Sequence, residues 1–293
     1  MALAWGVAAC TSEPTRPPTA GEPTLAPAAL PTERPTFWVD APTPGDPTPV
    51  RARAPATGAV LEADRVRLPP PRVASGPRRV GIQAGHWRTA EAPAEFPNLR
   101  LSPGGAFGEV SEVDVTLAVA RIVTDLLRER GIVADLIPAT VPPSYIADAF
   151  VSIHADGDET ATARGFKIAH GAYRSPYDEQ LVRSLTEHYG AASGLPWDPH
   201  VTDDMTDYYA FAWFRYEHAL APHTAAAIVE LGFISHPADR EILLERQEVV
   251  ARGLVEGILR FLDAVPRTSL FRDDIVVPTV PAPSVSPTPT SSP

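Results

Sequence analysis

The sequence predicts an α/β protein in which a largely parallel sheet carries helices on both faces. Along the middle of the chain, short apolar runs of strand length alternate with longer segments whose apolar residues recur every three or four positions. One run, Ala225–Leu231, is apolar throughout until Glu230, which is typical of a buried strand. The 34 prolines crowd the first hundred and the last thirty of the 293 residues, so the globular part is expected between them.

The first strand and helix of the expected domain follow the proline-rich stretch. Val80–Ile82 predicts the strand. Residues 113–130 show the pattern of an amphipathic helix, which Ser111 can cap and which Gly131 ends in the C′ position. The apolar stripe of this helix consists of Val113, Leu117, Ala120, Ile122, Val123, Leu126 and Leu127.

The remaining elements continue the alternation. Strands are expected at residues 132–137, where Pro138 ends the run, at residues 150–153, at residues 165–169 as an edge strand, and at residues 225–231. Helices are expected at residues 178–191 and at residues 238–264, the second as one long helix. Pro237 precedes the last helix, a position where its missing N–H costs nothing.

The two ends of the chain are expected to be disordered. Residues 11–77 run through Pro-Thr, Pro-Pro and Ala-Pro steps and predict a semi-rigid spacer, and residues 266–293 form a Pro/Ser/Thr-rich tail. Residues 1–10 resemble a signal leader, because Cys10 follows a short apolar stretch as the lipidated cysteine of a bacterial lipobox does. The alternative is a chance cysteine in an unstructured leader. Residues 78–265 remain as a single domain.

Composition excludes several classes of function. The formal net charge of −11 and the absence of a basic stripe argue against nucleic-acid binding. Cys10 is the only cysteine, so an intrachain disulfide and any cysteine-rich structural zinc site are excluded. No apolar run in the sequence is long enough to span a bilayer.

Two histidines each follow an expected strand. His86 comes after residues 79–85, and His154 comes after the run that ends at Ile153. Neighbouring parallel strands place their carboxyl ends at one edge of the sheet, where open α/β proteins build their sites. A glutamate from the following helix, either Glu109 or Glu112, would complete a His, Glu, His set with an open position, which is typical of catalytic zinc. Taken alone, His86 also fits a surface loop, His154 a core histidine and Glu112 a first-turn residue favoured by the helix dipole.

A third acidic residue is unusual because it lies inside an apolar strand. Glu230 must be neutral, paired or close to a metal, since an unpaired buried carboxylate is costly. A carboxylate with a raised pKa at a strand end suits a general base, although a structural partner for an arginine is the alternative. Asp156 and Asp158 follow His154 closely enough for either to serve as its carboxylate partner.

Four segments together resemble a known family. Residues 80–86, 112–120, 147–155 and 228–235, in this order, resemble the zinc-dependent N-acetylmuramoyl-L-alanine amidases of the amidase-3 type, over about Arg79 to Val265. The resemblance implies a mixed, about six-stranded sheet, a Zn²⁺ cofactor and peptidoglycan as substrate. It implies that His86, Glu112 rather than Glu109, and His154 bind the zinc and that Glu230 is the catalytic carboxylate. It also implies an extracytoplasmic enzyme of the bacterial cell envelope, expected as a monomer and lipid-anchored if Cys10 is modified.

The chain departs from the family pattern around these residues. Trp87 and Arg88 replace two glycines after His86, Asp156 stands where an asparagine is usual, and residues 139–147 are short and contain two prolines where a helix is usual. Substrate contacts are expected from Trp87, Asp156, His218 and His223. These departures leave open a related zinc hydrolase acting on another amide or muropeptide. A wall-binding protein without turnover and a purely structural surface protein are further alternatives.

Overall fold

A computed structural model describes residues 76–171, 175–213 and 215–272, and the backbone of five short flanking strands. In these flanks, β1 pairs with β4, and β3 pairs with β2 and β12, all antiparallel. The five strands are β1 (Trp38–Val39), β2 (Thr48–Arg51), β3 (Asp64–Leu68), β4 (Arg72–Val73) and β12 (Ile275–Pro278). The expected leader with Cys10, most of the expected spacer and the tail after residue 278 lie outside the described residues.

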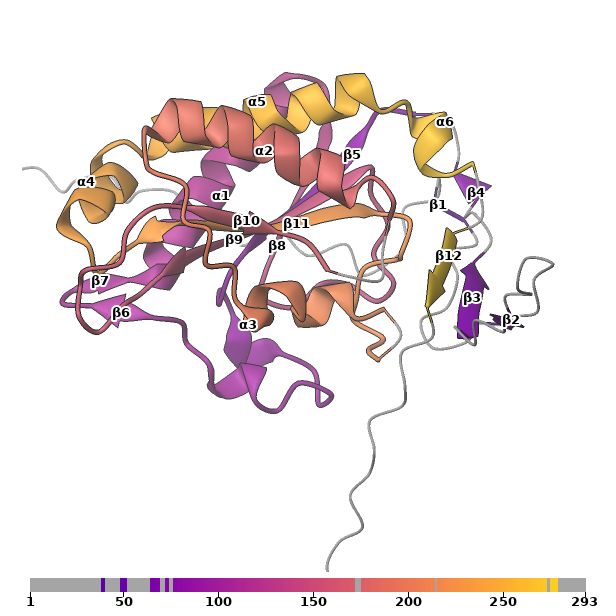
Figure 1. Cartoon of the computed structure of the whole chain (residues 1–293), viewed down its shortest axis with the longest axis horizontal. Coiled ribbons are helices and arrows are strands. Elements are labelled where there is room, and N and C mark those ends of the chain that lie inside the picture. The colour runs from indigo at the N-terminus through magenta and orange to yellow at the C-terminus, as the bar shows by residue number, and fades with distance from the viewer. Residues whose placement is uncertain are drawn as a thin grey trace, which may run out of the picture.

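The described domain is built on one five-stranded sheet in the order β10-β11-β9-β5-β8 (Figure 1). All neighbouring strands are parallel except β10, which pairs antiparallel with β11 at the edge. The expectation of a largely parallel α/β fold is therefore confirmed. The strands are β5 (Arg79–Ala84), β8 (Val133–Ile137), β9 (Ala149–Asp156), β10 (Lys167–Ala169) and β11 (Ala225–Phe233).

In the described part of the chain this sheet has five strands where about six were expected. Beyond β10, Trp197 makes only an isolated parallel bridge to Phe166. Pro196 and Pro199 flank this position, and because proline has no backbone N–H to donate, they disfavour a longer sixth strand there. The other edge strand, β8, is followed by turns over residues 139–147 and no helix, as the two prolines in that stretch indicated.

Three long helices cover one face of the sheet: α1 (Glu112–Glu129), α2 (Asp178–Ser193) and α5 (Gln247–Ala264) (Figure 1). The strand residues that pack under them are apolar and fully buried. The close packing of α5 on α2 depends on Gly253 and Gly257, since a Cβ atom at Gly253 would lie 2.7 Å from the Cβ atom of Ala192. The buried strand residues under the helices include Val80, Ile82, Val151, Ile153, Ala227 and Val229.

The single helix expected at residues 238–264 is in fact two helices. α4 (Pro237–Glu245) and α5 are separated at Arg246, whose φ of −123° is outside the helical range. α4 packs on β11, whereas α5 packs on α1 and α2, so the two helices need different directions. The apolar periodicity continues through the break, and for that reason the sequence pattern did not reveal it.

Short elements cover the opposite face of the sheet. α3 (Asp203–Thr206) and the 3₁₀ turn η3 (Tyr209–Phe211) contribute a second apolar cluster, which packs on Phe150, Ala226 and Ile228 of the central strands. Two further 3₁₀ turns, η1 (Thr89–Glu91) and η2 (Leu99–Leu101), and the hairpin β6 (Ala106–Phe107) and β7 (Val110–Ser111) connect β5 to α1.

A buried carboxylate fastens both ends of the domain to the amino end of β9. The Asp148 side chain accepts hydrogen bonds from the Arg79 backbone N–H at 2.7 Å and from the Arg267 guanidinium at 2.6 Å, and it forms an ion pair with Arg78 at 2.8 Å. Arg267, in the short helix α6 (Arg267–Leu270), also donates to the carbonyl oxygens of Gly76 and Pro77. This cluster, called the Asp148 clamp below, joins residues 76–79 to α6.

Candidate metal centre

The sheet face opposite the long helices changes from apolar to polar toward the carboxyl ends of its parallel strands. On β9 this face carries Phe150, Ser152 and His154 in succession, and on β11 it carries Ala226, Ile228 and Glu230. The strand register places Glu230 directly beside His154, and Lys167 of β10 directly beside Glu230. A row of three polar side chains therefore crosses the sheet at the edge where α/β proteins bind their ligands.

His86 occupies the tight turn that follows β5. Its φ is +59°, a left-handed conformation that few residues other than glycine adopt, and such strained positions cluster at functional sites. The Nδ1 atom lies 3.0 Å from the carbonyl oxygen of Ser102, to which an Nδ1–H group donates. The Nε2 atom then keeps its lone pair and faces Oε1 of Glu112 at 3.5 Å.

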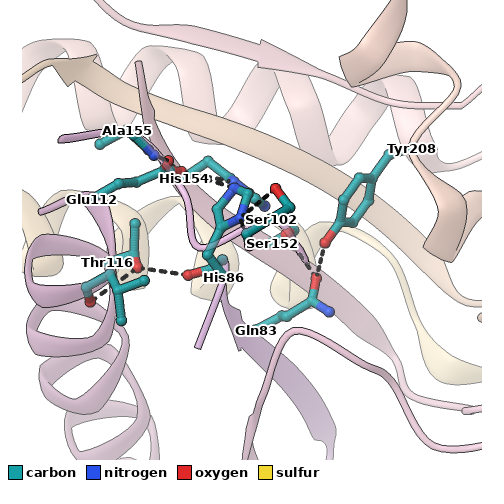
Figure 2. A network of polar contacts seen from close by, with 12 residues as sticks. Gln83, His86, Ser102, Glu112, Thr116, Ser152, His154, Ala155 and Tyr208 are labelled. Carbon is teal, nitrogen blue, oxygen red and sulfur yellow. Dashed lines mark hydrogen bonds and ion pairs between the residues drawn. The ribbon is translucent and has the colours of Figure 1, made fainter. Parts of the chain in front are cut away.

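Glu112 reaches the same point from the first turn of α1. Ser111 caps this helix by accepting a hydrogen bond from the Asp114 N–H at 3.2 Å. The Glu112 carboxylate accepts a hydrogen bond from the Gly105 N–H at 2.8 Å. It accepts a second one from the Ala155 N–H at 3.3 Å (Figure 2). Glu109 instead lies exposed in the turn between β6 and β7, so only Glu112 of the two candidates meets the histidines.

His154 completes a compact set of metal donors. One donor atom each from His86, Glu112 and His154 lies within 4.8 Å of the others. Nδ1 of His154 is 3.0 Å from Oε1 of Glu112, a contact between two lone-pair atoms that requires a proton or a cation between them (Figure 2). Two imidazole nitrogens and one carboxylate oxygen form the donor set of catalytic zinc sites that keep a position open for water or substrate.

The charges around Glu112 favour its ionised form. Burial opposes ionisation, but the hydrogen bond and charge of His154, the charge of His86 and the Gly105 N–H outweigh it, and the pKa of Glu112 lies below its ordinary value. An ionised carboxylate is the form that binds a metal ion.

Two glycines leave space that these side chains fill. A Cβ atom at Gly85 would lie 2.5 Å from Cε1 of the His154 ring, and one at Gly104 would lie 2.9 Å from Cγ of His86. Thr116 of α1 fixes the turn further, because its hydroxyl donates to the Gly85 carbonyl at 3.1 Å (Figure 2). The geometry of the donor set thus depends on residues that carry no ligand atom.

Glu230 lies in the adjacent row position and is only partly accessible to solvent. Burial raises its pKa well above the ordinary carboxyl value, and the neighbouring charges of Asp156 and Glu112 raise it further. Lys167 acts in the opposite direction. A carboxyl group with a raised pKa beside a metal-donor set has the properties of a general base.

The residues expected to contact substrate lie in different surroundings. Trp87 is partly buried against the core on the helix side of the sheet, with the Arg88 guanidinium carbon 5.6 Å from its ring centroid. Asp156 is partly exposed at the end of β9 and pairs with Lys167. His218 is half-buried and bound to Glu95 at 2.5 Å, whereas His223 is fully buried, which corrects the expectation that it lines the cleft.

The sequence did not identify a buried polar network beside His154. The hydroxyls of Ser152 and Tyr208 both donate to Oε1 of Gln83, at 2.7 and 2.8 Å (Figure 2). The Tyr208 ring stands edge-on to the His154 ring with their centroids 5.5 Å apart. Gln83 inside an apolar strand was the available signal, because buried amides are nearly always hydrogen-bonded.

Comparison with known proteins identifies relatives of the domain. A family model for N-acetylmuramoyl-L-alanine amidase matches residues 80–260, more than half of the chain. A search of curated proteins finds no match.

Several solved structures are similar to the chain. The catalytic domain of the N-acetylmuramoyl-L-alanine amidase CwlV from Bacillus (Paenibacillus) polymyxa var. colistinus is 19% identical, with a TM-score of 0.44 over 64% of this chain and 99% of that one. An N-acetylmuramoyl-L-alanine amidase from Clostridium difficile 630 is 17% identical, with a TM-score of 0.47 over 66% and 100%. The amidase Ami1 from Mycobacterium smegmatis is 20% identical, with a TM-score of 0.49 over 64% and 98%.

Proposed function

Because this chain belongs to the N-acetylmuramoyl-L-alanine amidase family, we propose that it hydrolyses peptidoglycan with a bound zinc ion and Glu230 as general base. The scissile bond is the amide between the lactyl group of N-acetylmuramic acid and L-alanine of the stem peptide. One observation carries the proposal: three metal donors converge within 4.8 Å beside a carboxylate of raised pKa, all inside the matched residues.

His86, Glu112 and His154 would hold the zinc ion. His86 would bind through Nε2, because its Nδ1 faces the Ser102 carbonyl, and His154 would bind through Nδ1, which faces Glu112. Two histidines and one carboxylate leave an open coordination position, which a structural site would not. A bound zinc ion supplies Lewis acidity toward the amide carbonyl and toward water.

Glu230 would move the proton in the reaction. Its carboxylate accepts a proton from the attacking water as the C–O bond forms, and it returns that proton to the L-alanine nitrogen as the C–N bond breaks. The raised pKa of Glu230 suits the first half of this cycle, since a higher pKa makes the carboxylate a stronger base toward the attacking water. The products are a free lactyl carboxylate and a stem peptide with an amino terminus.

Substrate contacts would come from the rim of this centre. Asp156 is the best placed of the expected residues, because it is partly exposed two residues beyond His154. Trp87 and the half-buried His218 are further candidates. His223 is left out because its side chain is fully buried.

Peptidoglycan lies outside the cytoplasmic membrane, so we place the enzyme in the extracytoplasmic envelope. None of the helices in the described ranges is both long enough and apolar enough to cross a bilayer. Attachment through a lipid on Cys10 remains part of the proposal, and mass spectrometry of the membrane-extracted protein would detect it as added acyl mass on that residue.

Digestion of purified peptidoglycan tests the activity. The full chain loaded with zinc is compared with Glu230→Gln, which keeps the size of the side chain and removes the base, and with wild-type protein treated with a chelator. Mass spectrometry should find free stem peptides that begin with L-alanine only in the zinc-loaded wild-type digest. If a zinc-bound wild-type protein releases none, the substrate is a different amide, as the departures at Trp87 and Asp156 allow, or the domain binds the wall without turnover.

A further inference from the structure

Lys167 is unusual both as a residue type in this chain and in its buried position. It is the single lysine among the 25 basic Lys and Arg side chains of the protein. It is also buried, with only 4% of its surface exposed, on the edge strand β10. A buried ammonium group is costly unless it is paired, and a compact ammonium fits sites that a planar guanidinium does not.

The side chain of Lys167 reaches across the sheet. Its Nζ atom lies 2.5 Å from Oδ2 of Asp156 and 3.8 Å from Oδ2 of Asp198. Asp156 belongs to β9, and β11 lies between β9 and β10. The lysine must therefore cross β11 to make this ion pair.

The crossing point lies beside the proposed general base. On β11, Glu230 pairs in register with Lys167, and Phe233 pairs with Asp156. The Lys167 ammonium lies 5.1 Å from the centroid of the Phe233 ring. The lysine side chain thus passes over β11 between Glu230 and Phe233.

The positive charge of Lys167 acts on two acidic groups of the site. Asp156 and Glu230 are two acidic groups on adjacent strands, and the charge of Asp156 disfavours the charge of Glu230. The Lys167 ammonium pairs directly with Asp156, and its positive charge also favours the ionised form of Glu230, so it offsets the repulsion between the two carboxylates.

We propose that Lys167 is a positioning residue of this amidase, whose bridge from β10 across β11 to Asp156 fixes the Asp156 and Glu230 carboxylates relative to each other. This inference rests on the proposed role of Glu230. The inferred role of Lys167 is to place Glu230, and it includes neither metal binding nor contact with the substrate.

A double-mutant cycle on the zinc-loaded full chain tests this role. The variants are Lys167→Met, Asp156→Asn and the double variant, and kcat and KM are measured from the release of stem peptide. Lys167→Met should lower kcat by roughly 10- to 100-fold, the scale of loss from an approximately 1 Å displacement of a reacting group, with KM changed much less. The loss should be several-fold smaller in the Asp156→Asn background, where the repulsion is absent. Arg183→Met serves as the control, because it breaks an exposed ion pair with Glu179 on α2.

A second measurement does not depend on turnover. Labelling with [13Cε]lysine gives one signal from this protein, since it contains one lysine. That signal should shift in Asp156→Asn and in Glu230→Gln and stay in place in Arg183→Met. This lysine signal also tests the proposal if the Lys167→Met variant does not fold.

Two results would overturn the proposal: equal losses of kcat from Lys167→Met in both backgrounds, or a lysine signal that ignores Glu230→Gln. Either result, with Glu230→Gln still inactive, leaves the proposed function intact. An inactive wild-type protein would instead remove the proposed function itself.

Discussion

The absence of a side chain at Gly85 leaves room for the His154 ring of the candidate metal centre. In Gly85→Ala the new Cβ atom would lie 2.5 Å from Cε1 and 2.6 Å from Nδ1 of His154. Ordinary contact between such atoms begins near 3.5 Å, so the ring must move by roughly 1 Å. The φ of Gly85 is not positive, so the backbone itself accepts alanine.

The displaced ring should bind zinc poorly. Moving Nδ1 of His154 away from Glu112 breaks the 3.0 Å contact that defines the donor set. We expect zinc affinity to fall by roughly 10- to 100-fold, as when a group that orients a metal ligand is lost, which corresponds to about 1.4–2.8 kcal/mol. The metal-free protein should lose about 1–3 kcal/mol of stability from overpacking.

Competition with a chromophoric chelator measures the zinc affinity, and chemical denaturation of the metal-free protein measures the stability. Gly157→Ala is the matched control, because its Cβ atom would meet no atom within 4 Å although it lies three residues beyond His154. Wild-type zinc affinity in Gly85→Ala would refute the reasoning, since it would mean that His154 is not a ligand or that the ring has room to move.

Three further substitutions have defined outcomes. Glu230→Gln should abolish turnover yet stabilise the metal-free protein by about 1–3 kcal/mol near neutral pH, because burying a charged carboxylate is costly. Because the pKa of Glu230 is raised in the folded protein, its contribution to folding stability is complete below the unfolded value of 4.5 and is lost as pH rises through the folded value. The stabilities of wild type and Glu230→Gln should therefore converge in acid. A difference in denaturation midpoint that stays constant with pH would contradict this. Arg88→Gly should stabilise the protein by about 1 kcal/mol, because Arg88 holds φ at +62° where glycine is unstrained, and an unchanged or lower Tm would show that its contact with Glu91 matters more. Asp148→Asn should cost about 1–3 kcal/mol in chemical denaturation, because asparagine has no charge to pair with the partly buried Arg78 and Arg267, while zinc affinity stays at the wild-type value.

Most of the sheet could be predicted from local pattern, and its limits were set by packing. The five strands and α1 follow from apolar runs and periodicity, which depend only on neighbouring residues. The break at Arg246 could not be predicted, because it arises from the different partners of α4 and α5. The number of strands came from the family resemblance, and Pro196 and Pro199 are the local residues that disfavour a sixth strand in this chain.

The two histidines of the candidate metal centre could be predicted because each directly follows a strand that the sequence predicts. His86 and His154 follow apolar runs, and the resemblance selected Glu112 over Glu109, which the geometry agrees with. Lys167 and Tyr208 were missed because their contacts depend on strand order and on a loop far along the chain, neither of which periodicity encodes. His223 was misplaced because nothing in the sequence distinguishes a cleft wall from a filled interior.

The Asp148 clamp has a mechanical consequence for an enzyme that works on a polymer network. The two segments that flank the domain, residues 76–79 and α6, are fastened to the same carboxylate at the start of β9. His154 lies six residues further along that strand, roughly 20 Å away at the usual rise per residue. A pull transmitted through both flanking segments would therefore be carried between them at the clamp, and the catalytic end of the sheet would stay outside the path of the force.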